Sequence, residues 1–174
     1  MTFREELEQL RKNDRIKANP SLIERYDAVC APLDKVKKPT TAPKTEALVV
    51  EFLTRKGHQG QKITTAGTFI PGEKYQSGAM TIRGKDKYIP GGNTKGAADI
   101  TSSIYGLKVD WELKFSKGDR QSEKQKVFQE RVENSGGLYY IFRDIDHFYE
   151  LYNDLMQLPQ IELMKQFHEN KTVC

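Results

Sequence analysis

The chain has 174 residues, a length typical of a single domain that can bury a core without disulfides. Hydrophobic residues make up 37% of it and charged residues 30%, and no apolar run is long enough to span a membrane. Its two cysteines and three widely spaced histidines exclude a disulfide framework and a zinc cluster. The N-terminus lacks the apolar stretch of a signal peptide, so we expect an intracellular, cytoplasmic protein without membrane contacts. The net charge of +4 permits an anionic partner without requiring one.

The first part of the chain predicts helices followed by a linker. Residues 3–13 form a charged amphipathic pattern, and Ser21 is in position to cap a second, short helix. Residues 31–44 contain three prolines and several lysines, which is typical of a linker or an extended arm. We therefore predict an N-terminal helical arm and linker over residues 1–43, a main domain over 44–157 and a C-terminal helical tail over 158–174.

The main domain predicts an α/β fold. A helix is expected over residues 44–56, then short strands separated by glycine turns, and then a hairpin over residues 99–115. A helix over 122–134, a buried strand over 138–142 and a helix over 146–158 follow. This order predicts a mixed central β-sheet flanked by helices.

The hairpin carries charges where a core strand normally has none. With Tyr105 and Gly106 as the turn, counting back places Asp99 opposite Glu112. Strand parity puts Glu112 and Lys114 on one face, and Val109, Trp111, Leu113 and Phe115 on the core face. Two opposed carboxylates repel each other, and a divalent cation between them is the simplest way to offset this repulsion.

Two carboxylates with a lysine two positions further on suit phosphodiester hydrolysis. Their hard oxygen atoms are ligands for Mg²⁺ or Mn²⁺, and the lysine can orient water or offset developing charge. The alternative for Glu112 and Lys114 taken alone is a solvated strand face, because acidic-x-Lys triplets are common in a lysine-rich chain. Gln125 has two interpretations of equal weight: an inward-facing site residue, or the partner of Ser122 in a capping box.

Taken together, these segments resemble the PD-(D/E)XK nuclease superfamily, and most closely its VRR-NUC (virus-type replication-repair nuclease) branch. The resemblance covers about residues 46–149 and is carried by the following stretches: TEALVVEFLTRKG, GGNTKGAAD, WELKFSKG, SEKQKVF and SGGLYYIFRD. It implies a restriction-endonuclease-like core, with Asp99 and Glu112 as metal ligands, Lys114 as the catalytic lysine and Gln125 as an additional site glutamine. Ala98 departs from the family pattern, in which a proline commonly precedes the aspartate.

The resemblance also implies an acid on the first helix, which is either Glu46 or Glu51. We prefer Glu46, which shares a helical stripe with Val50 and Leu53. Both glutamates are also compatible with an ordinary solvated helix face.

Cations near the predicted site are candidates for phosphate binding, although a solvated loop is the commoner explanation for any one of them. The predicted DNA-binding residues are Arg83, Lys85, Lys95, Lys117, Arg120 and Lys124. Aromatic residues among them, such as Tyr88, can stack on exposed bases.

These expectations combine into a metal-dependent DNA endonuclease acting in replication, recombination or repair, in a bacterial or phage-infected cell. Small members of the resembled family suggest branched DNA such as Holliday junctions as substrate, and a homodimer with two active sites. The alternatives are a restriction-like endonuclease with sequence preference and a nucleic-acid-binding protein that does not cleave.

Overall fold

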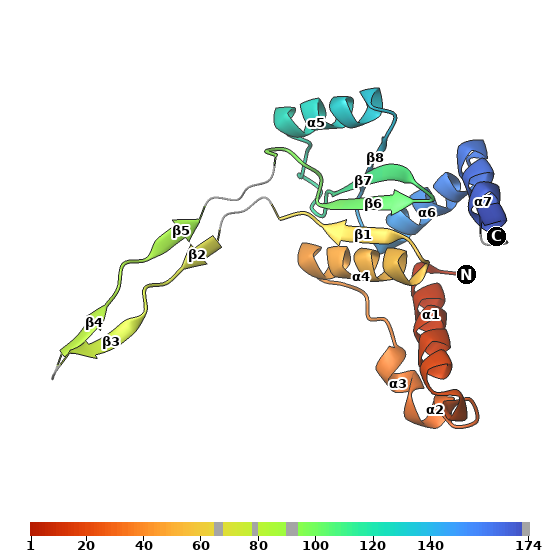
Figure 1. Cartoon of the computed structure of the whole chain (residues 1–174), viewed down its shortest axis with the longest axis horizontal. Coiled ribbons are helices and arrows are strands. Elements are labelled where there is room, and N and C mark those ends of the chain that lie inside the picture. The colour runs from red at the N-terminus through yellow and green to blue at the C-terminus, as the bar shows by residue number, and fades with distance from the viewer. Residues whose placement is uncertain (65–67, 78–79, 90–93, 172–174) are drawn as a thin grey trace.

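A mixed four-stranded sheet forms the centre of the molecule (Figure 1). The structure is a computed structural model of the chain and describes residues 1–64, 68–77, 80–89 and 94–171. The strand order is β1 (Gln59–Lys62), β6 (Ile100–Ile104), β7 (Leu107–Leu113) and β8 (Leu138–Phe142). Only the β7–β8 pair of this sheet is parallel, and the other two pairs are antiparallel. The predicted α/β class with a mixed sheet is thus confirmed.

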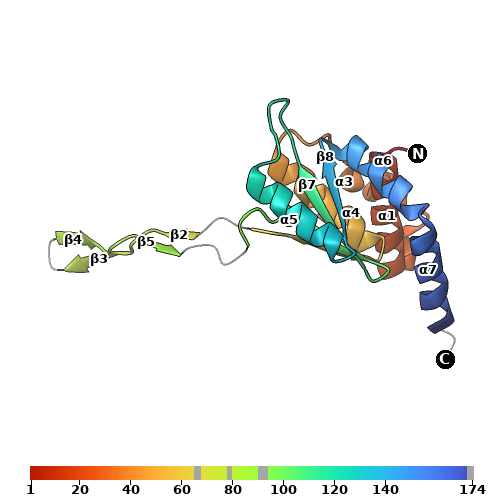
Figure 2. The ribbon, with the colours of Figure 1, turned by 90° about the horizontal axis from the view of Figure 1, so that it is seen from above.

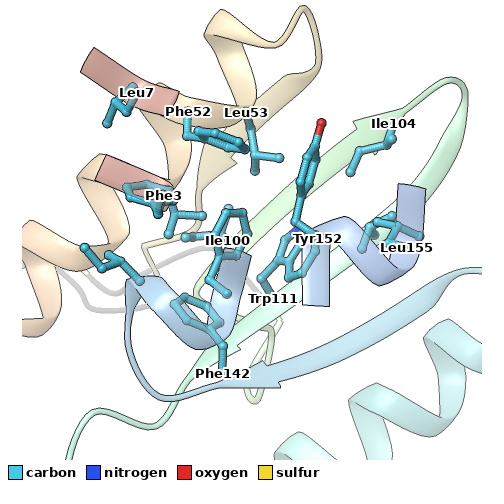
Figure 3. Close-up of a cluster of buried hydrophobic side chains, with 14 of the residues drawn as sticks. Phe3, Leu7, Phe52, Leu53, Ile100, Ile104, Trp111, Phe142, Tyr152 and Leu155 are labelled. Atoms are coloured by element: carbon cyan, nitrogen blue, oxygen red, sulfur yellow. The ribbon is translucent and has the colours of Figure 1, made fainter. Parts of the chain in front are cut away.

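Helices cover both faces of the sheet (Figures 1 and 2). Helix α5 (Glu123–Asn134) covers one face, while α4 (Ala42–Arg55) and α6 (Ile145–Met156) pack on the other. Strand β7 serves both layers because its side chains alternate between the faces. Trp111 lies in the main core with Phe52 and Tyr152 (Figure 3), and Val109 belongs to the same core. Asp110 and Glu112 are buried on the opposite face, under α5.

The N-terminal segment contributes to that same core. It forms α1 (Phe3–Ala18), η1 (Pro20–Leu22), α2 (Tyr26–Val29) and α3 (Ala31–Asp34). Phe3 and Leu7 of α1 are fully buried, and the Phe3 ring lies 5.0 Å from that of Phe52. Residues 1–43 therefore share a core with residues 44–157. The prediction of an extended linker from residue 31 was wrong in part, because α3 is helical and Val36 is buried.

The helices on either side of the predicted main-domain boundaries begin close to the predicted residues. Helix α4 begins at Ala42, two residues before the predicted start, with Pro43 in its first turn. The C-terminal segment forms α7 (Pro159–Lys171), as the predicted helical tail requires, and its Ile161 is buried in the main core. None of the described helices is both long and apolar enough to cross a membrane.

The hairpin β6–β7 has the predicted turn and register. Tyr105 and Gly106 have φ angles of 50° and 87°, which is the pattern of a type I′ turn. Ile104 pairs with Leu107 and Ile100 with Trp111, so Asp99 is next in register to Glu112. Phe115 corrects the prediction: β7 ends at Leu113, and Phe115 is 39% exposed instead of lying in the core.

Four short strands form a ribbon that extends away from the body (Figures 1 and 2). Strand β2 (Thr68–Ile70) pairs with β5 (Lys87–Ile89), and β3 (Lys74–Ser77) pairs with β4 (Met80–Arg83). Large apolar side chains are exposed on it, namely Phe69, Ile70, Tyr88 and Ile89.

Candidate active site

Strand β7 carries the centre of the site on the face beneath α5. Glu112 is 1% exposed and Lys114, directly after the strand, is 6% exposed. The Lys114 Nζ lies 2.8 Å from Oε1 of Glu112 and also forms a longer ion pair, 3.6 Å, with Asp119. The Lys114 backbone N–H donates to the carbonyl of Phe142 at 2.8 Å, which extends the pairing with β8 beyond the end of β7. The lysine is thus fixed at both its backbone and its ammonium.

Asp99 reaches the same place from the strand next to β7. It stands immediately before β6, and its Oδ2 accepts a hydrogen bond of 2.9 Å from the backbone N–H of Leu113. This bond ties the Asp99 carboxylate to the end of β7, one residue from Glu112.

The carboxylates in the site affect one another's protonation. Burial raises the pKa of Asp99, and the negative charge of Glu46 raises it further. Burial likewise raises the pKa of Glu112, to which the charge of Asp99 adds. Lys114 opposes both shifts. Carboxylates with raised pKa values in a shared place are typical of functional sites.

Gln125 faces inward and also forms the capping box, so its contacts are compatible with both interpretations. Ser122 and Gln125 form a capping box at the start of α5, in which the Gln125 Oε1 accepts from the Ser122 backbone N–H at 2.8 Å. The same oxygen accepts from Lys114 Nζ at 3.1 Å, and Nε2 donates to Glu112 Oε1. The cap of α5 therefore also orients two residues of the site.

Glu46 and Glu51 lie in different surroundings. Glu46 is 7% exposed and forms an ion pair with Lys62 of β1. Its charge reaches Asp99. Glu51 instead binds Arg11 of α1 with both carboxylate oxygens, at 2.8 and 2.7 Å, and also pairs with Arg55. The structure therefore brings Glu46 toward Asp99 and assigns Glu51 to the contact between α4 and α1.

Two residues at the site were not identified from the sequence. Lys62 approaches Glu46 from β1, and the hydroxyl of Tyr139 on β8 donates to Glu112 Oε2 at 3.3 Å. Burial and the charge of Glu112 raise the pKa of Tyr139, so the phenol stays protonated and remains a donor. Nothing local to either residue signals this role, because each depends on pairing between distant strands.

The carboxylates of the site are of the kind that bind a magnesium ion. Among the residues that the structure describes, no group of three or more His, Cys, Asp or Glu side chains is arranged to hold a metal. Mg²⁺, however, is commonly bound by one or two carboxylates and completed by water and substrate phosphate. Asp99 and Glu112 supply two such carboxylates, and the oxygen-only chemistry fits. Lys62 pairs with Glu46 and Lys114 with Glu112.

The predicted DNA-binding residues fall into three places. Lys95 and Lys124 line a groove of about 360 Å³ along α5, together with Val127, Phe128 and Arg131. Lys117 and Arg120 are exposed on the loop between β7 and α5, next to the site. Arg83 and Lys85 lie on the ribbon, and Arg83 forms an ion pair of 2.8 Å with Asp86. The structure thus gathers the first two sets near the site and leaves the third on the extension.

A glycine holds the approach to Asp99 against α5. Gly96 has φ of +88°, and a Cβ there would lie 2.5 Å from the carbonyl oxygen of Lys124. Only glycine allows this close approach, which brings Lys95 beside Lys124. Residues 91–93 of the same predicted stretch lie outside the described residues.

In comparisons with known proteins, the chain matches no protein-family model and no curated protein.

Proposed function

We propose that this chain is a metal-dependent DNA endonuclease with a restriction-endonuclease-like core of the VRR-NUC type. The observation that carries the proposal is the convergence of Asp99, Glu112 and Lys114 with the capping glutamine Gln125 at the end of β7. Three of these four residues are interlocked, and all belong to the set that the resemblance implies. A buried ammonium beside two carboxylates of raised pKa is unusual for a structural ion pair alone.

The chain's own residues suggest how the reaction is supported. Asp99 and Glu112 would hold a Mg²⁺ or Mn²⁺ ion, which would supply Lewis-acid polarisation of the phosphate. The Lys114 ammonium offsets negative charge that develops on the phosphate, or orients the attacking water. Gln125 and Tyr139 hold the Glu112 carboxylate by hydrogen bonds to its two oxygens, so its orientation is set before substrate arrives. Burial at the site strengthens each of these interactions.

The substrate and assembly belong to the same proposal. Branched DNA such as a Holliday junction, cut by a homodimer in replication, recombination or repair, is the version that the resemblance favours. The rivals are a sequence-preferring, restriction-like endonuclease and a DNA-binding protein that does not cleave. A cytoplasmic location follows from a role on bacterial or phage DNA.

Cleavage assays separate these versions. The protein is incubated with a four-way junction, a linear duplex of the same sequence and supercoiled plasmid, each with Mg²⁺, with Mn²⁺ and with excess EDTA. We expect junction cleavage that requires the metal. Preferential cutting of particular plasmid sequences supports the restriction-like version. DNA binding without cleavage under every metal condition supports the non-cleaving version, and undiminished cleavage in EDTA removes the metal from the proposal.

The carboxylates are tested by replacements that keep their shape. Asp99→Asn and Glu112→Gln should each reduce cleavage by at least about a hundredfold, because each removes a proposed ligand charge. DNA binding should be kept or become tighter, because negative charge near phosphate is lost. Glu150→Gln, at an exposed position on α6, is the matched control and should leave cleavage unchanged. Near-native cutting by either site variant would show that the site is elsewhere.

A further inference from the structure

A second carboxylate on β7 is buried without a hydrogen bond. Asp110 is 1% exposed, and neither of its carboxylate oxygens has a hydrogen-bond partner among the described residues. Asp110 forms an ion pair with Lys108, whose Nζ lies 3.2 Å from Oδ2 without hydrogen-bond geometry. Aspartate is rarely buried unless its charge and its oxygens are satisfied, since removing a carboxylate from water is unfavourable. The position therefore calls for a partner with N–H donors.

Asp110 lines a cavity directly beside the proposed active site. The cavity has a volume of about 210 Å³ and is bounded by Thr94, Ala98, Thr101, Lys108 and Phe128 in addition to Asp110. Thr101 is the cross-strand partner of Asp110, so the hydroxyl and the carboxylate stand on the same face. Ala98 is adjacent to Asp99, and Asp110 is one strand repeat from Glu112. The cavity is therefore lined by chain neighbours of both proposed metal ligands.

We propose that this cavity binds an unstacked guanine base next to the phosphate that is cut, a site that rests on the proposed function. A carboxylate has two acceptor oxygens in a plane and binds best a group with two parallel N–H donors. Among the DNA bases, guanine alone presents two adjacent donors, N1–H and N2–H, on its pairing edge. Phe128 provides an aromatic surface and Thr101 a hydroxyl, which are the usual further contacts of an extruded base.

Lys108 occupies the place of that donor in the free protein. Its ammonium is held between the Asp110 carboxylate and the Phe128 ring, 5.6 Å from the ring centroid. The lysine side chain is 54% exposed, so it can turn outward without disturbing the core. A guanine that takes over Asp110 would release the ammonium toward the neighbouring phosphate. Charge balance is then kept, because the base satisfies the carboxylate and Lys108 neutralises the phosphate.

The test measures binding in EDTA, so that it does not depend on cleavage. Two single-stranded oligothymidylates are compared by fluorescence anisotropy, one with a central guanine and one with hypoxanthine in its place. Hypoxanthine lacks the 2-amino group and therefore one donor to Asp110. We expect the wild-type protein to bind the guanine strand about tenfold more tightly, as for one hydrogen bond to a charged group.

Asp110→Asn should remove that ratio, because an amide presents one acceptor where the carboxylate has two. Asp154→Asn, on the exposed face of α6, makes the same chemical change elsewhere and should keep the affinity ratio. Lys108→Gln should weaken binding to both strands alike and should therefore also keep the affinity ratio. The ratio is the readout because loss of a negative charge can itself tighten DNA binding.

Equal binding of the two strands by the wild-type protein overturns the proposal, and this comparison stands even where Asp110→Asn does not fold. A ratio that survives in folded Asp110→Asn overturns it as well. Cleavage without guanine selectivity would leave the proposed function standing and remove the base site. Guanine selectivity without cleavage would leave the base site standing and remove the proposed function.

Discussion

Gln125 shows how one side chain can fix both a helix end and two charged residues of the proposed site. Its amide oxygen accepts from the Ser122 backbone and from Lys114, while its nitrogen donates to Glu112. Because the capping box fixes the start of α5, the amide that faces Glu112 and Lys114 has little rotational freedom. Preorganisation of this kind is what a hydrolytic site needs, since misplaced groups lose rate quickly.

Lys114 offers the sharpest test at a single residue. Lys114→Arg keeps the positive charge but places a larger, planar guanidinium in a site that is only 6% exposed. If the ammonium acts on water or on the phosphate, we expect the variant to bind DNA and metal and to lose most cleavage. Its melting temperature and its DNA affinity are measured beside the cleavage rate. Retained turnover would reduce Lys114 to a structural counter-charge for Glu112.

Much of the site was predictable because it depends on local rules. The two-residue turn at Tyr105 and Gly106 sets the register, and the period of two sets the face, so Asp99, Glu112 and Lys114 followed from the sequence. The positions of Lys62 and Tyr139 at the site could not be predicted from the sequence. They come from β1 and β8, whose pairing with β6 and β7 is long-range and leaves no local pattern.

Among the elements, α1 shows how a mostly charged helix joins the core. Its sequence is dominated by charged residues around a narrow apolar stripe, and Phe3 and Leu7 of that stripe are fully buried against α4 and α6. Ion pairs at its edges reinforce the contact, for example Arg11 with Glu51 and Lys56 with Glu6, each at 2.7 to 2.8 Å. A narrow apolar stripe is enough to dock a helix when the surrounding charges find partners, and no local signal identifies those partners.

The docking of α1 predicts a large stability loss in Leu7→Ala. Removing a fully buried leucine side chain should lower the free energy of unfolding by about 2–5 kcal/mol. Urea unfolding can be followed by the fluorescence of Trp111, which is the single tryptophan and lies in the same core. Leu33→Ala, at a position 67% exposed on α3, is the control and should change stability by less than about 0.5 kcal/mol. An unchanged Trp111 transition in Leu7→Ala would mean that α1 folds apart from the core.

At the scale of the whole molecule, the positive charge is spread over separate surfaces. Lys117 and Arg120 flank the site, and Lys95 and Lys124 line the groove along α5. A third set, on a groove of about 740 Å³ beside α4, includes Lys35, Lys37, Lys38 and Lys44. The sequence gives the net charge of +4 but not this division, because the division depends on how helices pack. The effect of phosphate contacts near the site on DNA binding should therefore be separable from the effect of the protein's net charge.

The paired replacement Lys117→Gln/Arg120→Gln tests that separation. Both side chains are exposed beside the site, so their loss should weaken binding to all DNA sequences alike. A protein that makes two fewer phosphate contacts displaces fewer counterions from DNA when it binds. The slope of log K against log salt should therefore become shallower by about two. Lys17→Gln/Arg25→Gln removes the same charges from exposed positions in the N-terminal segment, and its slope should match that of the wild type. Equal slopes for both double variants would mean that the protein responds only to net charge, and a sequence-selective loss would assign Lys117 or Arg120 to base contacts instead.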